Sequence, residues 1–293
     1  MRGLRLLAGH KKKAVLLTVI AGLLWGTSFP AIKIGLQYMD AYTFAFLRFL
    51  FASLVMISVS LLTKKFSFNF NKKRLILLLG VTNGLAYLLQ YIGMVSTSAS
   101  KSALFVNLSV VWVALLSPIL LKERVGNKKI LGVAASLVGV LFMTTNLDFS
   151  SLTNGTVIGD LLVITAGIAW AFFIVYNKPL VMDCKNMLQT MTWLLVFTLL
   201  PLLPTATFSA GIFAALPLDA WLAVFYTAVF CWVIPYYLWL KGLKNIPAVT
   251  SSVVLLTEVI VAVAISTLVL GEAFTMVSGL GAVFIILAIL LVS

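Results

Sequence analysis

The sequence predicts an all-α integral membrane protein with ten transmembrane helices, arranged as two inverted five-helix repeats. Three observations predict this fold class: a very apolar composition, apolar segments separated by short basic loops, and a similarity between the two halves. Of the 293 residues, 62% are hydrophobic and 10% are charged, whereas soluble domains average about 45–50% apolar and about 25% charged residues. No soluble fold has an interior for so much apolar surface, so the lipid bilayer is the expected surrounding.

Ten segments approach or exceed the length of about 20 apolar residues that a helix needs to cross a bilayer core. The first of them is interpreted as a span and not as a cleaved signal peptide, because it is longer than a signal core of roughly 7–15 residues. Membrane-spanning helices are expected at 14–36, 42–62, 75–96, 99–121, 130–146, 157–178, 187–206, 219–241, 248–270 and 273–292.

The basic residues give the chain a net charge of +13, but they cluster in the short loops between these segments. Basic loops mark the cytoplasmic side of a membrane protein. Placing the N-terminus in the cytoplasm puts 18 of the 21 basic residues on that side and leaves Lys33, Arg48 and Lys101 toward the outer ends of their spans. The pattern predicts a multi-pass plasma-membrane protein with both termini cytoplasmic, and it argues against nucleic acid as a partner.

The two halves of the chain share residues at nearly constant offsets. At an offset of 145, Ala21, Gly22, Trp25 and Lys33 match Ala166, Gly167, Trp170 and Lys178. At an offset of 149, Tyr87, Leu89, Gly93, Ala99, Ser102, Glu123 and Gly132 match Tyr236, Leu238, Gly242, Ala248, Ser251, Glu272 and Gly281. Five spans in each half, an odd number, require the second half to be inverted. Two repeats are therefore expected, at 1–146 and 147–293, with a substrate site near the midplane between them.

The order of several motifs carries a family resemblance: GLLWGTSFPAIK (22–33), LRFLFA (47–52), STSASKSALF (96–105), LLKERV (120–125) and LTEVIVAV…LVLGEAF (256–274). It resembles the drug/metabolite transporter superfamily, specifically its ten-span EamA-type exporters, over essentially the whole chain. One departure is Val259, where the family often has a proline. The resemblance implies that spans one to four and six to nine surround the cavity and that spans five and ten are peripheral.

Two charged residues lie well inside expected spans, where a charge is costly and is by default a functional candidate. Arg48 is a candidate for binding or gating, and Glu258 for proton coupling or as a counter-ion. A structural ion pair between them is the alternative. Pro30 is expected to kink the first span, since proline removes a helical hydrogen bond. That kink serves either gating or static packing, while Lys33 is expected to extend to the outer interface.

Two stripes of side chains form the rest of the expected cavity. In the third span, Asn83, Tyr87 and Gln90 share one helix face, and lipid would penalise so polar a face. The offset of 149 carries these residues onto Trp232, Tyr236 and Trp239 in the eighth span. Asn107, Trp25 and Trp170 are expected to complete the lining, with ordinary packing as the alternative for each aromatic residue.

These features predict a secondary transporter that exports small metabolites by alternating access, with amino acids or related amphipathic compounds as the substrate class. Proton coupling through Glu258 is an additional hypothesis. The alternative is transport or exchange of phosphorylated metabolites or nucleotide sugars, although these anions usually require several cavity cations. The sequence has no GxxxxGK[ST] loop, no cluster of metal ligands and a single histidine, His10, so neither an enzyme nor a cofactor nor a metal is expected. Glycines in the peripheral spans would suit helix packing or a homodimer.

Overall fold

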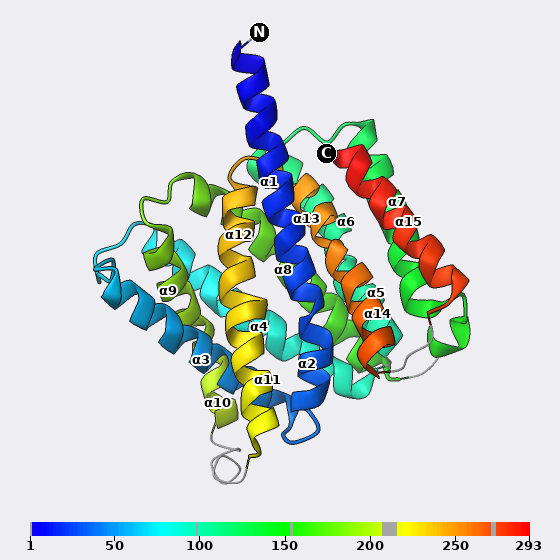
Figure 1. The fold of residues 1–293 in the computed structure, drawn as a ribbon, viewed down its shortest axis with the longest axis horizontal. Helices are drawn as coiled ribbons and strands as arrows, with labels where there is room; N and C mark the ends of the chain where they lie inside the picture. The colour runs from blue at the N-terminus through cyan, green and yellow to red at the C-terminus, as the bar shows by residue number, and fades with distance from the viewer. Residues whose placement is uncertain (1, 98, 153–154, 207–215, 271–273) are drawn as a thin grey trace.

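The structure of the protein is a computed structural model that describes residues 2–97, 99–152, 155–206, 216–270 and 274–293. All regular elements in these ranges are helical, and one isolated bridge joins Thr97 to Gly155. In chain order (Figure 1), the helices are α1 (Arg2–Gly26), α2 (Ser28–Gly35), α3 (Ala41–Leu62), α4 (Lys73–Ser96), α5 (Ala99–Asn107), α6 (Ser109–Leu116), η1 (Ser117–Leu121), α7 (Asn127–Thr145), η2 (Phe149–Leu152), α8 (Val157–Met182), α9 (Met187–Thr198), η3 (Leu200–Leu202), α10 (Leu203–Ala206), α11 (Leu218–Ala228), η5 (Val229–Val233), α12 (Ile234–Leu243), α13 (Ala248–Leu255), α14 (Thr257–Leu270) and α15 (Met276–Val292).

Within the described ranges, eight helical segments are long and apolar enough to cross a membrane. They are Gly9–Gly35, Ala41–Leu62, Lys73–Ser96, Ser102–Leu121, Asn127–Thr145, Val157–Met182, Leu218–Leu243 and Ala248–Leu268. Two shorter apolar helices, Met187–Leu202 and Met276–Val292, stand where the seventh and tenth spans were expected. Prolines at 201 and 204 interrupt the seventh. The total of ten spans therefore stays a prediction.

Three of the spans are interrupted within their apolar segments. The first breaks at Thr27, the fourth at Leu108 and the ninth at Leu256. The breaks in spans four and nine occupy almost the same place in the two halves, since the last residue of α5, Asn107, corresponds to Leu256 at the offset of 149. Short π-helical segments, η1 and η5, widen spans four and eight. Broken helices of this kind are tolerated in a membrane where they line a protein-enclosed or wet site.

The fifth and tenth segments, α7 and α15, pack on each other at one side of the molecule (Figure 1). Their backbones approach closely at Gly139 and Gly281. A Cβ atom on either glycine would lie 2.7 Å from the carbonyl oxygen of the other. Small residues at such a crossing let membrane helices gain van der Waals contact. This placement leaves the remaining helices to build the centre of the bundle.

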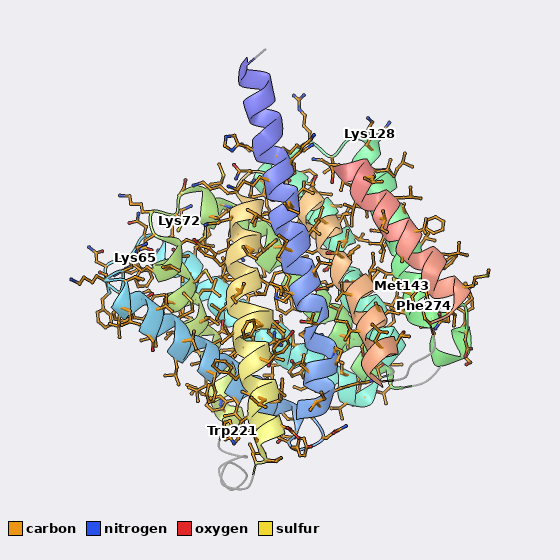
Figure 2. All side chains as sticks on the ribbon, viewed as in Figure 1. Lys65, Lys72, Lys128, Met143, Trp221 and Phe274 are labelled. Atoms are coloured by element: carbon orange, nitrogen blue, oxygen red, sulfur yellow. The ribbon has the colours of Figure 1, made fainter. Side chains whose placement is uncertain are left out.

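Both termini lie at one end of the molecule (Figure 1), and the Nζ atom of Lys11 donates a hydrogen bond to the carbonyl oxygen of Ser293. Lys72 and Lys128 lie in the same half of the view, whereas Trp221 lies at the opposite end (Figure 2). We call the end that holds both termini the basic end. An even number of crossings is required to bring the two termini to one side.

Candidate functional site

Six aromatic side chains form a closed loop of ring contacts where the two halves meet. Around the loop, the centroid distances are 5.9 Å for Trp232–Phe49, 4.8 Å for Phe49–Tyr87, 4.8 Å for Tyr87–Trp170, 5.7 Å for Trp170–Phe173, 5.9 Å for Phe173–Tyr236 and 4.5 Å for Tyr236–Trp232. We call these six residues the aromatic loop. Tilted, edge-to-face and stacked pairs of this kind contribute about 0.5–1.5 kcal/mol each beyond burial. The rings therefore hold one another in place.

Two tryptophans extend the aromatic loop on the side of α12. The ring of Trp239 lies 5.6 Å from Tyr236 and 6.2 Å from Phe173. Trp25 of α1 lies 6.0 Å from Trp239. Trp239 is almost fully buried, while Trp25 keeps part of its surface accessible. The first span thus reaches the same aromatic group as the eighth.

Hydrogen bonds fix the orientation of three of these rings. Trp170 donates from Nε1 to Oε1 of Gln90 at 3.3 Å. The hydroxyl of Tyr236 donates to Oδ1 of Asn177 at 2.7 Å, and Trp239 donates from Nε1 to Oγ of Ser251 at 2.8 Å. A buried indole or phenol usually needs such a partner. The polar stripe of α4 and the aromatic stripe of α12 are thereby connected through α8.

Arg48 lies against the aromatic loop, with a side chain that is only 2% exposed. Its guanidinium carbon is 5.3 Å from the ring centre of Tyr87 and 5.7 Å from that of Phe49. One terminal nitrogen donates to the carbonyl oxygen of Cys231 at 3.1 Å, while the buried Nε atom has no partner among the described residues. A buried charge is strongly unfavourable unless it is paired and hydrogen-bonded. The cation therefore keeps unused capacity to bind an anion.

Glu258 lies in the first turn of α14, directly after the break at Leu256, and is half-buried. The expected alternative of an ion pair with Arg48 is not formed: within the described part of the chain, the guanidinium donates to a backbone carbonyl instead. The two charged groups are therefore separate features of the site. A helix N-terminus favours a negative charge nearby.

The first span approaches this break through two glycines four residues apart. A Cβ atom on Gly22 would lie 2.1 Å from Oγ1 of Thr257, and one on Gly26 would lie 2.6 Å from the carbonyl oxygen of Glu258. Thr27, where the first span itself breaks, accepts a hydrogen bond from the hydroxyl of Tyr226 at 2.8 Å. Two interrupted helices therefore cross at their interruptions. Pro30 is buried in α2, three residues beyond the break.

Two predicted site residues form hydrogen bonds outside the aromatic loop. Asn83 is buried where α4 packs on α9, and its Nδ2 donates to Oγ1 of Thr198 at 3.1 Å. The polar face of α4 therefore contacts two neighbouring helices: Asn83 bonds to α9 and Gln90 bonds to α8. Asn107 donates from Nδ2 to the carbonyl oxygen of Ala103, one turn back in its own helix.

Sequence reasoning missed two members of the aromatic loop, Phe49 and Phe173. Phe49 directly follows Arg48, and Phe173 stands three residues after Trp170. That spacing puts the second pair on one helix face. Proximity to candidates already chosen was the only signal, because phenylalanine is common throughout the apolar segments.

The sequence profile of the EamA-like transporter family matches residues 12–145 and, a second time, residues 157–293. The chain belongs to this family. The uncharacterized transporter YetK of Bacillus subtilis is 30% identical over 270 residues, which cover 87% of this chain and 79% of that protein. An uncharacterized transporter of Archaeoglobus fulgidus is 29% identical over 242 residues, 80% of this chain and 81% of that one.

A protein of known crystal structure has the same fold, with a TM-score of 0.76 over 96% of both chains at 15% sequence identity. As an EamA-like protein with many apolar helices, the chain is a multi-pass integral membrane transporter. The family resemblance read from the sequence motifs is thereby confirmed. The two profile matches coincide with the two halves that the offsets of 145 and 149 relate.

Proposed function

We propose that this EamA-like transporter carries small amphipathic metabolites, with amino acids or related carboxylates as the substrate class, by alternating access around the aromatic loop. The observation that carries the proposal is Arg48. Its guanidinium is buried between Tyr87 and Phe49, close to Tyr91, and donates to the carbonyl oxygen of Cys231, while its Nε has no partner among the described residues. A carboxylate accepts a pair of parallel hydrogen bonds from such a group.

The surroundings of Arg48 support an organic carboxylate with an apolar part. The aromatic loop offers ring faces and edges for an apolar or cationic portion of the substrate. Glu258 would serve as a counter-ion for an ammonium group or as the carrier of a coupled proton. Within the described residues of the interior, Arg48 is the cation that contacts the aromatic loop. A phosphorylated substrate usually calls for more than one.

The remaining parts of the proposal concern direction and orientation. Export is the proposed direction, with both termini cytoplasmic in a plasma membrane and the two halves inverted relative to each other. The clustering of basic residues in the loops of one side supports this orientation. The pairing of α7 with α15 away from the centre is compatible with a peripheral or dimer-forming role for these helices.

Uptake by proteoliposomes tests the role of Arg48. A panel of labelled amino acids and of sugar phosphates is offered in counterflow, in which substrate loaded inside drives uptake from outside. We expect amino acids to be taken up, and we expect Arg48→Gln to reduce their uptake at least about tenfold, a loss of about 1.4 kcal/mol. Arg48→Lys restores charge but not the bidentate geometry, so its uptake should also stay well below that of the unmodified chain.

A matched control is Lys73→Met, because Lys73 also lies over an aromatic ring, 5.4 Å from Phe70, but on the exposed surface. Uptake should be unaffected by this change. Uptake of sugar phosphates without amino acids would replace the substrate class by the phosphorylated one. Unchanged amino-acid uptake in Arg48→Gln would remove Arg48 from the site.

A further inference from the structure

At the basic end, Lys178 ties α8 to the corner between α12 and α13. Its Nζ atom donates to the carbonyl oxygens of Leu243 at 2.7 Å, Ile246 at 2.8 Å and Lys244 at 3.3 Å. Carbonyls at the end of a helix lack an intrahelical donor, and a cation beside them is favoured by the helix dipole. Lys178 is half-buried and forms no ion pair within the described residues. The ammonium group of Lys178 therefore stabilises the backbone of residues 243–246.

Glu123 holds the same corner from its other side. Both of its carboxylate oxygens accept from the backbone N–H of Ala248, at 2.9 and 3.1 Å, and Ala248 is the first residue of α13. Glu123 itself follows η1, at the end of the fourth span. Side chains from α8 and from the end of the fourth span therefore both form hydrogen bonds with the backbone of residues 243–248. We call Lys178 and Glu123 the corner clamp.

Beneath the corner clamp the bundle is tightly closed. Every residue from Ala248 to Val254 is buried. Trp239 and Tyr236 are each 1% exposed, and their hydrogen bonds reach Ser251 in α13 and Asn177 in α8. The helices that the clamp joins therefore close the basic end of the aromatic loop.

The repeat-related residues in the other half of the chain are arranged differently. At the offsets of 145 and 149, Lys33 corresponds to Lys178, and residues 94–97 to residues 243–246. Yet the side chain of Lys33 is exposed, and its helix α2 packs on α11 and α14. In the 94–97 corner, the carbonyl oxygen of Ser96 instead accepts from the N–H and the hydroxyl of Thr156, at 2.8 and 3.1 Å.

Inverted-repeat transporters change the open side when their two halves exchange arrangements. We propose that the corner clamp of Lys178 and Glu123 is the closed gate at the basic end, and that Lys33 closes the 94–97 corner when the basic end opens. This inference rests on the proposed alternating-access function. It predicts opposite effects for substitutions of Lys178 and Lys33, which occupy equivalent positions in the two repeats.

Thiol accessibility tests the gate without requiring a substrate. In a chain whose Cys184 and Cys231 are replaced by serine, a single probe is placed as Ser251→Cys at the basic end or as the repeat-related Ser102→Cys at the other end. Membrane-impermeant maleimide is added to vesicles from either side. We expect Lys178→Met to raise the labelling rate of the probe at 251 about fivefold or more, because three charge-assisted hydrogen bonds are lost, and to lower labelling at 102.

Lys33→Met should change both rates in the opposite direction. Lys178→Arg, which keeps cationic donors for the carbonyls, should stay close to the parent. Glu123→Gln should act like Lys178→Met but more weakly, since an amide oxygen still accepts from Ala248. Glu123→Gln also serves as the decisive variant if Lys178→Met does not accumulate in the membrane.

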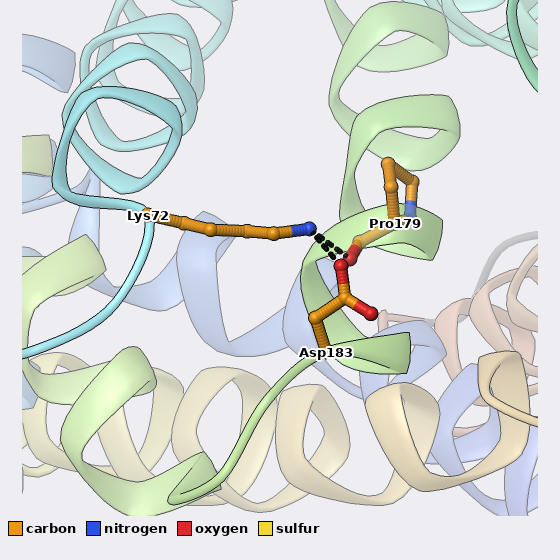
Figure 3. Close-up of polar contacts among 3 residues, drawn as sticks. All are labelled: Lys72, Pro179 and Asp183. Carbon is orange, nitrogen blue, oxygen red and sulfur yellow. Dashed lines mark hydrogen bonds and ion pairs between the residues drawn. The ribbon is translucent and has the colours of Figure 1, made fainter.

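Lys72 supplies a matched control at the same end. Its Nζ atom lies 2.5 Å from Oδ2 of Asp183 and donates to the carbonyl oxygen of Pro179 at 2.8 Å (Figure 3). These contacts join α4 to α8, two helices that pack along their length. Lys72→Met should therefore leave both labelling rates unchanged.

The proposal is overturned if Lys178→Met and Glu123→Gln leave the labelling at 251 unchanged, or if Lys178→Met and Lys33→Met shift the probes in the same direction. Failure of the proposed function has a different result. In that case no compound of the panel is transported, whatever the labelling rates do. If uptake persists but Lys178→Met leaves the labelling rates unchanged, the gate proposal alone is wrong.

Discussion

Glu258 is a half-buried carboxyl group in the first turn of α14, beside the contact that Gly26 makes with its carbonyl oxygen. Its position differs from that of Arg48, which is fully enclosed by aromatic rings and backbone. A carboxyl group can gain or lose a proton and so change its charge, whereas a guanidinium keeps a charge of fixed sign. The two residues are therefore suited to different tasks in one site.

Glu258→Gln separates proton coupling from substrate binding. If Glu258 carries the proton, uptake driven by a pH gradient should fall at least about tenfold, a loss of about 1.4 kcal/mol, while counterflow, which needs no net proton movement, should persist. Comparing the two assays in the same proteoliposomes measures this split. Asp219→Asn, which removes an exposed carboxylate in the first turn of α11, should change neither. Loss of counterflow together with gradient-driven uptake would make Glu258 a binding residue instead.

At the scale of the element, the crossing of the first and ninth spans is a close helix–helix contact at the site. Gly22 and Gly26 allow α1 to lie directly on the residues around the break between α13 and α14. Small residues four apart are a recurrent device for close helix approach in membranes. Because both helices are interrupted there, the crossing is a place where halves of spans can turn relative to each other.

Gly26→Ala tests this crossing. The added Cβ atom would lie 2.6 Å from the carbonyl oxygen of Glu258 and 2.7 Å from Cβ of Val261, so the helices must separate at a cost of about 1–3 kcal/mol. We expect a melting temperature lower by several degrees and reduced uptake. The same substitution at Gly279, where the nearest side-chain atom is 3.7 Å away, should leave both unchanged. Equal behaviour of the two variants would show that the crossing tolerates separation.

Several elements could be predicted from the sequence because composition alone determines them. The edges of the expected spans at 42–62 and 157–178 differ from Ala41–Leu62 and Val157–Met182 by a few residues. In the eighth span, the three aromatic residues that the offset of 149 had selected, Trp232, Tyr236 and Trp239, contact one another in a row. The breaks at Leu108 and Leu256 were not predicted, since leucine is a good helix former and no local signal marks them.

The orientation of Asn83 shows a second limit of the same reasoning. Positions four and seven residues apart share a helix face, but one face of α4 is wide enough to meet both α9 and α8. Asn83 therefore bonds to Thr198 while Gln90 bonds to Trp170. Sequence spacing defines a face, and only the packing of neighbours divides it between a cavity and a helix contact.

At the scale of the whole molecule, the family profile matches twice and the fold is shared with a crystal structure at a TM-score of 0.76. The clustering of basic residues, the common end for both termini and the two matched halves are the basis of one predicted topology. In that topology, the connection between the halves lies on the side opposite to both termini.

Reporter fusions test this topology. A reporter after Ser293 should be cytoplasmic and one inserted after Ser150 should be external, because an odd number of spans separates the two positions. Two reporters are used, one active only in the cytoplasm and the other only outside it. Each reporter is fused in turn at Ser150 and at Ser293, so that the side of each position is measured by both. Finding both positions on the same side would require a different number of spans and would end the inverted-repeat interpretation.

The contact between Lys11 and Ser293 has a consequence for how orientation is acquired during synthesis. Since Ser293 lies beside Lys11 of α1, a short linker can join the C-terminus to a first helix shortened to begin near Lys11, and the gene can be reopened between Ser150 and Thr156. The first helix to leave the ribosome would then be α8, which must insert in the opposite sense to α1. If the permuted protein still folds and transports, the lysine and arginine pattern of the finished chain, and not the order of synthesis, determines which way it faces.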